Sequence, residues 1–291
     1  MGVVQGLWGL GAAITSRAAR HGQMARASQF AYVAFVAAIP FVFMLIAIIG
    51  LVASPSAYST LIDNARGTIP DDLANFLDGL FQAASSSASQ SIVFLVLGLL
   101  AGIWLAGNVA GSLTDGLDDA FECPHRGWLH GKARSIVLAI LTAFVFVLTT
   151  ILAVLGPVVL QWVLESVGAT RATQVLLQFA VSIAGAAIFW GFLVLLYRYA
   201  PNDHKATLRD AMLGALVGLA GWLLVVNLFR LYVDNFGSYN RVYGSLGAVV
   251  LFLVFLYLTG FTILVGGETS AELTERDDRA PARQPLPPAF P

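Results

Sequence analysis

The sequence predicts an all-α polytopic membrane protein: a bundle of six transmembrane helices with one or two short amphipathic interfacial helices. Of the 291 residues, 58% are hydrophobic and only 11% are charged, far below the roughly 25% charged residues of soluble domains. Six apolar stretches also reach or approach the roughly 20 residues that a helix needs to cross a bilayer. These stretches are 30–52, 91–111, 136–160, 175–197, 211–229 and 244–266.

Lysine and arginine are unevenly distributed between the stretches. The N-terminal segment, the second gap, the fourth gap and the C-terminal tail hold twelve of them, whereas the other three gaps hold four. Because positive charges concentrate on the cytoplasmic side, we expect both termini in the cytoplasm and a multi-pass protein in the plasma membrane. The four residues expected outside are Arg66, Arg171, Arg230 and Arg241.

The gaps are too short for a folded soluble domain of about 50 residues, so we expect a single transmembrane domain over residues 28–272. Residues 1–27 precede it as a cytoplasmic amphipathic segment, in which apolar residues recur at helical spacing. This segment is either an interfacial helix or the frayed start of the first span. Residues 273–291 are rich in proline and arginine, which predicts a disordered cytoplasmic tail.

The first span contains Pro40 near its middle, where proline removes one backbone hydrogen bond and kinks a helix. In the following external gap, a capping box at 68–71 precedes apolar residues at helical spacing, which predicts a short amphipathic helix over 70–84. The sequence contains no convincing internal repeat, and an inverted three-plus-three arrangement stays open.

Small residues at four-residue spacing predict close helix packing. Gly98 and Gly102 form such a pair in the second span, and Gly214 and Gly218 form one in the fifth. This spacing lets two helix backbones approach each other within the bilayer. The alternative is that these surfaces slide past each other in a moving transporter.

Polar residues inside or at the ends of the spans are the candidates for function, because each is costly at membrane depth unless it is paired or hydrated. For Asn108, Asn227 and Glu268, a cavity-lining role and an interfacial role are both open. Arg230 and Asp234 are spaced for an ion pair, and we expect Arg230 to point into a polar cavity. The candidate substrate path or gate comprises Asn108, Asn227, Arg230, Tyr232, Asp234, Tyr243 and Glu268.

Catalytic and cofactor chemistry is not predicted. Cys123, His125 and His130 fit no common zinc spacing, so no metal site is expected. The sequence contains no nucleophile, phosphate-binding or paired-carboxylate motif. We therefore expect neither an enzyme nor a pump driven by nucleotide hydrolysis. No basic surface of the kind that follows a nucleic-acid backbone is apparent.

Two motifs stand out in the last third of the chain: 196–202, Leu-Tyr-Arg-Tyr-Ala-Pro-Asn, and 210–214, Asp-Ala-Met-Leu-Gly. They resemble the Tyr-Arg-x-x-Pro-Asn and Asp-Ala-x-x-Gly signatures of the YihY/BrkB family of bacterial inner-membrane proteins. The aromatic loop 232–239 and the segment 264–268, Leu-Val-Gly-Gly-Glu, also match the family pattern. The chain departs from that pattern at Val33, where many members have an aromatic residue.

The resemblance implies six transmembrane helices in the bacterial inner membrane and a candidate transporter of lipids or other amphipathic or anionic molecules. Some members were once labelled ribonucleases, a label that the residues here do not support. The alternative function is a non-transporting scaffold for envelope assembly. Membrane lipids are the expected partners, nucleic acid is not, and a homo-oligomer is an open alternative.

Overall fold

The computed structural model describes residues 2–52, 79, 88–124, 141, 171–202, 206–236 and 240–279, and each regular element within them is an α-helix. The prediction of an all-α fold is therefore confirmed for this part of the chain. In chain order the helices are α1 (Gly2–Arg20), α2 (Gln23–Val52), α5 (Ala88–Ala120), α7 (Arg171–Tyr199), α8 (Leu208–Phe236) and α9 (Asn240–Arg279).

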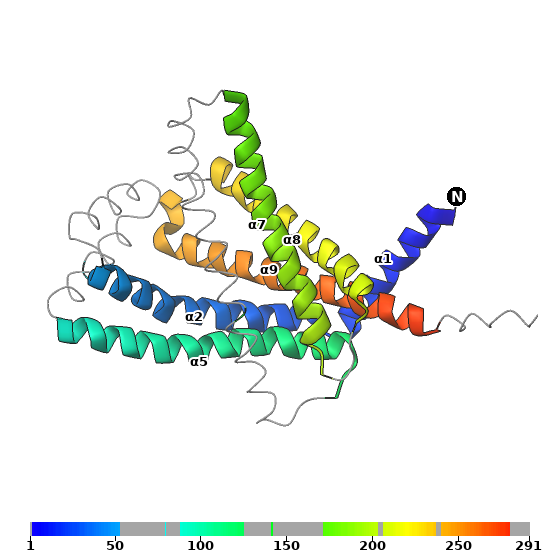
Figure 1. Cartoon of the computed structure of the whole chain (residues 1–291), viewed down its shortest axis with the longest axis horizontal. Helices are drawn as coiled ribbons and strands as arrows, with labels where there is room; N and C mark the ends of the chain where they lie inside the picture. Colours follow the sequence, from blue (N-terminus) through cyan, green and yellow to red (C-terminus); the bar gives the residue numbers. More distant parts are fainter. Residues whose placement is uncertain are drawn as a thin grey trace, which may run out of the picture.

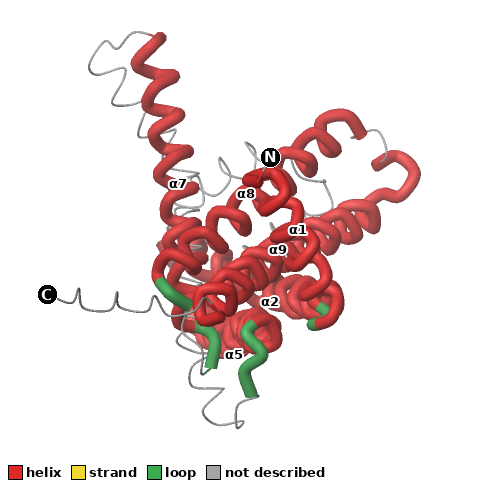
Figure 2. The backbone as a smooth tube through the Cα atoms, turned by 90° about the vertical axis from the view of Figure 1, so that its right-hand side faces the viewer, coloured by secondary structure: helices red, strands yellow, loops and turns green. Residues whose placement is uncertain are grey.

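Helix α9 is the central element of the described bundle. It packs along α8 and against α2, and it also contacts α1, α5 and α7 (Figure 1). Helix α2 lies along α5 for much of its length, while α7 packs on α8. Helix α1 projects away from the bundle near the C-terminal end of α9 (Figure 1), and Figure 2 views the molecule from that end. The charged end of α9 is therefore a meeting point of several helices.

Five of the six expected spans coincide with described helices, and each helix extends beyond its apolar stretch. Three segments are long and apolar enough to cross a membrane within the described residues: Phe179–Tyr199, Leu208–Tyr232 and Val249–Arg279. The expected third span, 136–160, lies outside the described residues except for the single residue 141. The expected outer helix 70–84 also lies outside them, except for Gly79, which is helical.

Helices cross both of the predicted domain boundaries. Helix α2 begins at Gln23, before the expected boundary at residue 28, and α1 is a separate helix instead of a frayed start of α2. The prediction of disorder from residue 273 is wrong for residues 273–279, because α9 continues to Arg279. Arg276 pairs with Glu272 and Arg279 with Glu275 at i,i+4 spacing, which stabilises this last part of the helix.

Local sequence explains where two of the helices begin and end. Helix α7 stops before Pro201, which supplies no N–H and disfavours helical geometry in the residue before it. Helix α8 then begins after Thr207, whose Oγ1 accepts a hydrogen bond of 3.2 Å from the N–H of Asp210. The Thr207 hydroxyl donates in turn to the Asp210 carboxylate. This reciprocal cap satisfies a backbone donor at the start of the helix.

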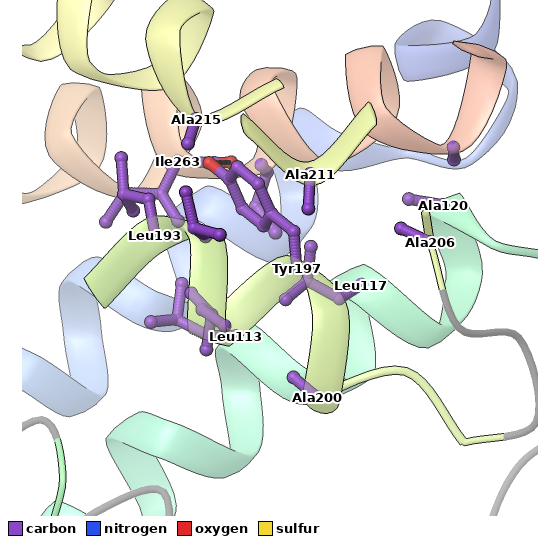
Figure 3. Packing of buried hydrophobic residues seen from close by; sticks show 14 of the residues in the cluster. Leu113, Leu117, Ala120, Leu193, Tyr197, Ala200, Ala206, Ala211, Ala215 and Ile263 are labelled. Carbon is purple, nitrogen blue, oxygen red and sulfur yellow. Dashed lines mark hydrogen bonds between the residues drawn. The ribbon is translucent and has the colours of Figure 1, made fainter. Parts of the chain in front are cut away.

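The core around Tyr197 depends on glycine. Tyr197 is fully buried, and its hydroxyl donates a 2.7 Å hydrogen bond to the carbonyl of Ile263 on α9 (Figure 3). A Cβ atom at Gly266 would lie 2.4 Å from that hydroxyl, and one at Gly218 would lie 2.7 Å from it. Gly214 packs equally closely, because a Cβ there would lie 2.6 Å from the carbonyl oxygen of Gly266. The absence of these side chains lets α7, α8 and α9 meet around one phenol ring.

Replacing Tyr197 with phenylalanine is expected to lower the free energy of unfolding by about 0.5–1.5 kcal/mol, because the hydrogen bond to Ile263 is lost while the ring still fills its site. Tyr32→Phe is the control, because Tyr32 is exposed. Thermal melting of the purified protein in detergent would measure both changes. Equal melting temperatures for the Tyr197→Phe variant and the unmodified protein would contradict the assigned role of this hydroxyl.

Candidate functional site

Seven residues from three helices and two turns form a largely buried polar network at the end of the bundle where α1 meets α9. Its members contact either the Glu268 carboxylate or the Arg17 guanidinium, and we call it the Glu268 network. It comprises Arg17, His21, Gln23, Glu122, Glu268, Glu272 and Glu275.

Glu268 is the centre of this network, and none of its side-chain surface is exposed. Its Oε1 accepts a 2.8 Å hydrogen bond from Gln23 Nε2 and lies 2.7 Å from His21 Nδ1. Its Oε2 accepts a longer bond of 3.4 Å from Nε of Arg17. A buried carboxylate is tolerated only when it is paired and hydrogen-bonded, and these contacts meet that requirement.

Arg17 joins α1 to the rest of the bundle. The residue is only 5% exposed, and its guanidinium faces four carboxylates at 2.5–3.8 Å. Its Nη2 also donates a 2.9 Å hydrogen bond to the carbonyl of Ala120, the last residue of α5. Carbonyls at a helix C-terminus have no partner within the helix and attract positive charge. Arg17 therefore stabilises the end of α5 as well as the acidic face of α9.

Two residues with positive φ form the turns beside the network. Gly22, with a φ of 63°, separates α1 from α2 and places His21 at the junction. Glu122, with a φ of 51°, follows the end of α5 in a conformation that usually requires glycine. For a residue with a side chain, this conformation costs of order 1–2 kcal/mol. The glutamate in this position lies 3.6 Å from His21 Nε2 and 3.8 Å from Arg17 Nη2.

A second set of polar contacts connects α5 with the segment between α7 and α8. The buried Asp118 carboxylate accepts a 2.8 Å hydrogen bond from the backbone N–H of Asn202. The Asn202 side chain donates to the carbonyl of Pro124. Asp210 accepts a 3.4 Å hydrogen bond from Thr274 on α9. These contacts hold the ends of α5, α7, α8 and α9 together next to the Glu268 network.

Of the seven candidate gate residues, Glu268 alone belongs to this network. Asn108 is half-buried on α5, and Asn227 is exposed on α8, where its amide donates to the carbonyl of Leu223. Arg230 and Tyr232 are exposed near the opposite end of α8. Asp234 and Tyr243 lie in α8 and α9, but their side chains lie outside the description. The expected inward direction of Arg230 and its pairing with Asp234 stay predictions.

The helix-packing and kink residues are placed as follows. Pro40 lies inside α2, which continues through it. Gly214 and Gly218 face α9 and Tyr197, whereas a Cβ at Gly102 would meet no described atom within 4 Å. Gly98 lies in α5, and its surroundings are outside the described residues.

Arg17, His21 and Gln23 were not identified as site residues from the sequence. Arg17 served there only as one of the positive charges that indicate the cytoplasmic side. One local signal was available: Arg17 and His21 are four residues apart and so lie on one helical face. Their partner Glu268, however, is about 250 positions away in the sequence, at a separation of 251 for Arg17 and 247 for His21. Within the described residues, no group of three or more His, Cys, Asp and Glu side chains is arranged to hold a metal ion.

Three of the four signature segments meet at this end of the bundle. Tyr197 and Asn202 come from segment 196–202, Asp210 and Gly214 from segment 210–214, and Glu268 from segment 264–268. The family model described as virulence factor BrkB matches residues 14–289, nearly the whole chain. The chain belongs to the BrkB family. BrkB-family membership also makes it a membrane protein, in agreement with the apolar helices.

Individual relatives are more distant. The chain is 28% identical to the ribonuclease-like protein YfkH of Bacillus subtilis over 280 residues, covering 90% of this chain and 94% of YfkH. It is 29% identical to a UPF0761 membrane protein of Xanthomonas campestris over 224 residues, covering 76% of this chain. That match spans 52% of the Xanthomonas protein, about half its length. No solved structure matches the chain.

Proposed function

We propose that this BrkB-family protein is a six-span transporter of lipids or other anionic amphipathic molecules in the bacterial inner membrane, and not an enzyme. The observation that carries the proposal is a buried ion pair, in which Glu268 is fully buried and Arg17 is almost fully buried. Charged residues in membrane helix bundles are rare and usually mark substrate or ion pathways. A scaffold that never changes shape gains little from such a pair, because well-packed apolar residues are often at least as stabilising.

The arrangement of partners supports a moving part. Arg17 has four carboxylates within reach, so it can exchange one partner for another without losing all of its charge compensation. A guanidinium also binds a carboxylate or phosphate through two parallel hydrogen bonds. An anionic headgroup is therefore the ligand class that could compete with these glutamates. We assign Arg230, Tyr232, Asp234 and Tyr243 to the opposite end of the same path.

Reconstitution in liposomes tests the proposal. A fluorescent anionic phospholipid in both leaflets should become accessible to an impermeant quencher faster with the protein than without it. Glu268→Gln and Arg17→Gln should each slow that exchange by at least about tenfold, the factor that corresponds to 1.4 kcal/mol in the barrier. Asp277→Asn is the control, because Asp277 is exposed on the same helix. Exchange equal to that of protein-free liposomes would favour the scaffold function instead.

The proposed topology places both termini in the cytoplasm, following the uneven charge distribution. In a Cys123→Ser background, an impermeant thiol reagent added to intact spheroplasts should label Ser86→Cys and leave Arg20→Cys unlabelled. Arg20 is suited to this test because it is exposed at the end of α1. After the spheroplasts are broken, both positions should react. Labelling of Arg20→Cys in intact spheroplasts would contradict the orientation.

A further inference from the structure

A chain of titratable groups leads from the exposed surface to the buried carboxylate. Glu122 is 63% exposed, and its Oε1 lies 3.6 Å from His21 Nε2. The other ring nitrogen, Nδ1, lies 2.7 Å from Oε1 of the fully buried Glu268. The imidazole itself is 13% exposed. His21 therefore faces a carboxylate on each side, one in contact with solvent and one removed from it.

The charge of His21 sets the charge balance of the network. Arg276 pairs with Glu272 and Arg279 with Glu275 on the same helix. From α2, Arg26 pairs with Asp119 of α5 at 2.7 Å. The two remaining carboxylates, Glu122 and Glu268, face Arg17 and His21. They are balanced by two positive charges only when the imidazole is protonated.

The same histidine sits where α1 is attached. Helix α1 packs mainly against α9 and α2, and its Arg17 also donates to the carbonyl of Ala120 in α5. Gly22 separates α1 from α2. Ala18 is buried against the bundle, whereas its neighbour Ala19 is exposed. The side chains of Arg17 and His21 supply the polar contacts of this attachment. A change in the charge of His21 therefore acts directly on the contact between α1 and the bundle.

We propose that His21 is a proton-binding site whose protonation locks α1 onto the bundle. The proton reaches the Glu122 carboxylate from water and passes to the lone pair of His21 Nε2, which restores the Glu122 carboxylate. The ring keeps its Nδ1–H toward Glu268 and gains one positive charge. The hydrogen bond to the Glu268 carboxylate thereby becomes an ion pair with both partners charged, and a second ion pair forms with Glu122. In a transporter, the ion coupled to transport would then be a proton. This part of the proposal rests on the proposed function.

The direction of the pH effect follows from the charges. Both neighbours of His21 are carboxylates, so its protonated form favours the attached position of α1. Attachment is therefore strongest when the ring is protonated and weakens when a rise in pH removes that proton. Histidine is the side chain whose charge ordinarily changes between about pH 5 and 8.

Thiol accessibility measures the attachment of α1 directly, without a measurement of lipid exchange. In the full-length Cys123→Ser protein in liposomes, the maleimide labelling rate of Ala18→Cys is divided by that of Ala19→Cys at each pH. The division removes the intrinsic pH dependence of thiol reactivity. The ratio should rise at least about tenfold from mildly acidic to mildly alkaline pH, a usual size for coupling between two sites.

Two substitutions of the same residue separate the proposal from a general loosening. His21→Gln keeps a neutral donor and should give a high ratio at every pH, whereas His21→Arg keeps a positive charge and should give a low one. Replacing the chain's other histidines, His125, His130 and His204, with glutamine is the matched control and should leave the rise intact. Two results would overturn the proposal. One is an Ala18→Cys to Ala19→Cys labelling ratio that does not change with pH in the protein that keeps His21, and the other is a rise in this ratio that persists in His21→Gln. Because the readout is thiol labelling and not lipid exchange, this outcome is independent of whether lipid exchange occurs in the reconstitution assay.

Discussion

Replacing Glu268 with leucine should lower the free energy of unfolding by about 3–5 kcal/mol, the cost of leaving one member of a buried ion pair without its partner. Arg17 would keep its contacts with Glu272 and Glu275, but His21 and Gln23 would lose the oxygen that both of them approach. Denaturant titration or thermal melting in detergent would measure the loss.

A double-mutant cycle distinguishes loss of the pair from loss of packing. The Arg17→Met and Glu268→Leu replacements together should cost less than the sum of the two single replacements, because the pair is then removed as a unit. Asp277→Asn, on the exposed part of α9, should change stability by no more than about 0.5 kcal/mol. Strict additivity of the two single replacements would show that Arg17 and Glu268 do not depend on each other.

Replacing Gly266 with alanine should also destabilise the protein, by about 1–3 kcal/mol. The new methyl group would lie 2.4 Å from the Tyr197 hydroxyl, 2.8 Å from the Gly214 carbonyl oxygen and 2.9 Å from the Gly218 Cα. Two of these three atoms belong to the backbone. Because they cannot move by a side-chain rotation, α8 and α9 would have to separate. Separation would also break the hydrogen bond between Tyr197 and Ile263.

Gly191→Ala on α7 is the matched control for this substitution. A Cβ at Gly191 meets no described atom within 4 Å, and alanine is favoured over glycine in a helix by up to about 1 kcal/mol. The control should therefore be neutral or stabilising, whereas Gly266→Ala should be destabilising despite the same gain in helix propensity. Similar melting temperatures for the two variants would contradict the close crossing of α8 and α9.

The length of apolar runs was sufficient to predict most of the helices but not where they end. The hydrocarbon limits only the apolar part of a helix, so α5 continues through Asp115, Asp118 and Asp119 to Ala120. Similarly, α9 continues through Glu272 and Glu275, where ion pairs one turn apart stabilise the helix. Apolar periodicity contains no information about such charged extensions.

The candidate site could be predicted from the sequence only in part. Glu268 stood out because a carboxylate follows directly after an apolar stretch, and its side chain is fully buried in the structure. Its partners could not be identified, because Arg17 and His21 resemble ordinary interfacial charges until the fold brings α1 against α9. The role of Tyr197 was equally inaccessible, since its contacts depend on three glycines from two other helices.

Helix α9 has 40 residues and is therefore about 60 Å long at 1.5 Å per residue. This is about twice the thickness of the hydrocarbon region, so a large part of the helix extends beyond the hydrocarbon as a continuous rigid segment. A tilt of about 10° would move an end about 30 Å from the pivot by about 5 Å, close to one helical turn. That displacement exceeds the 3.4 Å between Arg17 Nε and Glu268 Oε2. A small rotation of α9 within the lipid is thus large enough to exchange the ionic partners at its far end.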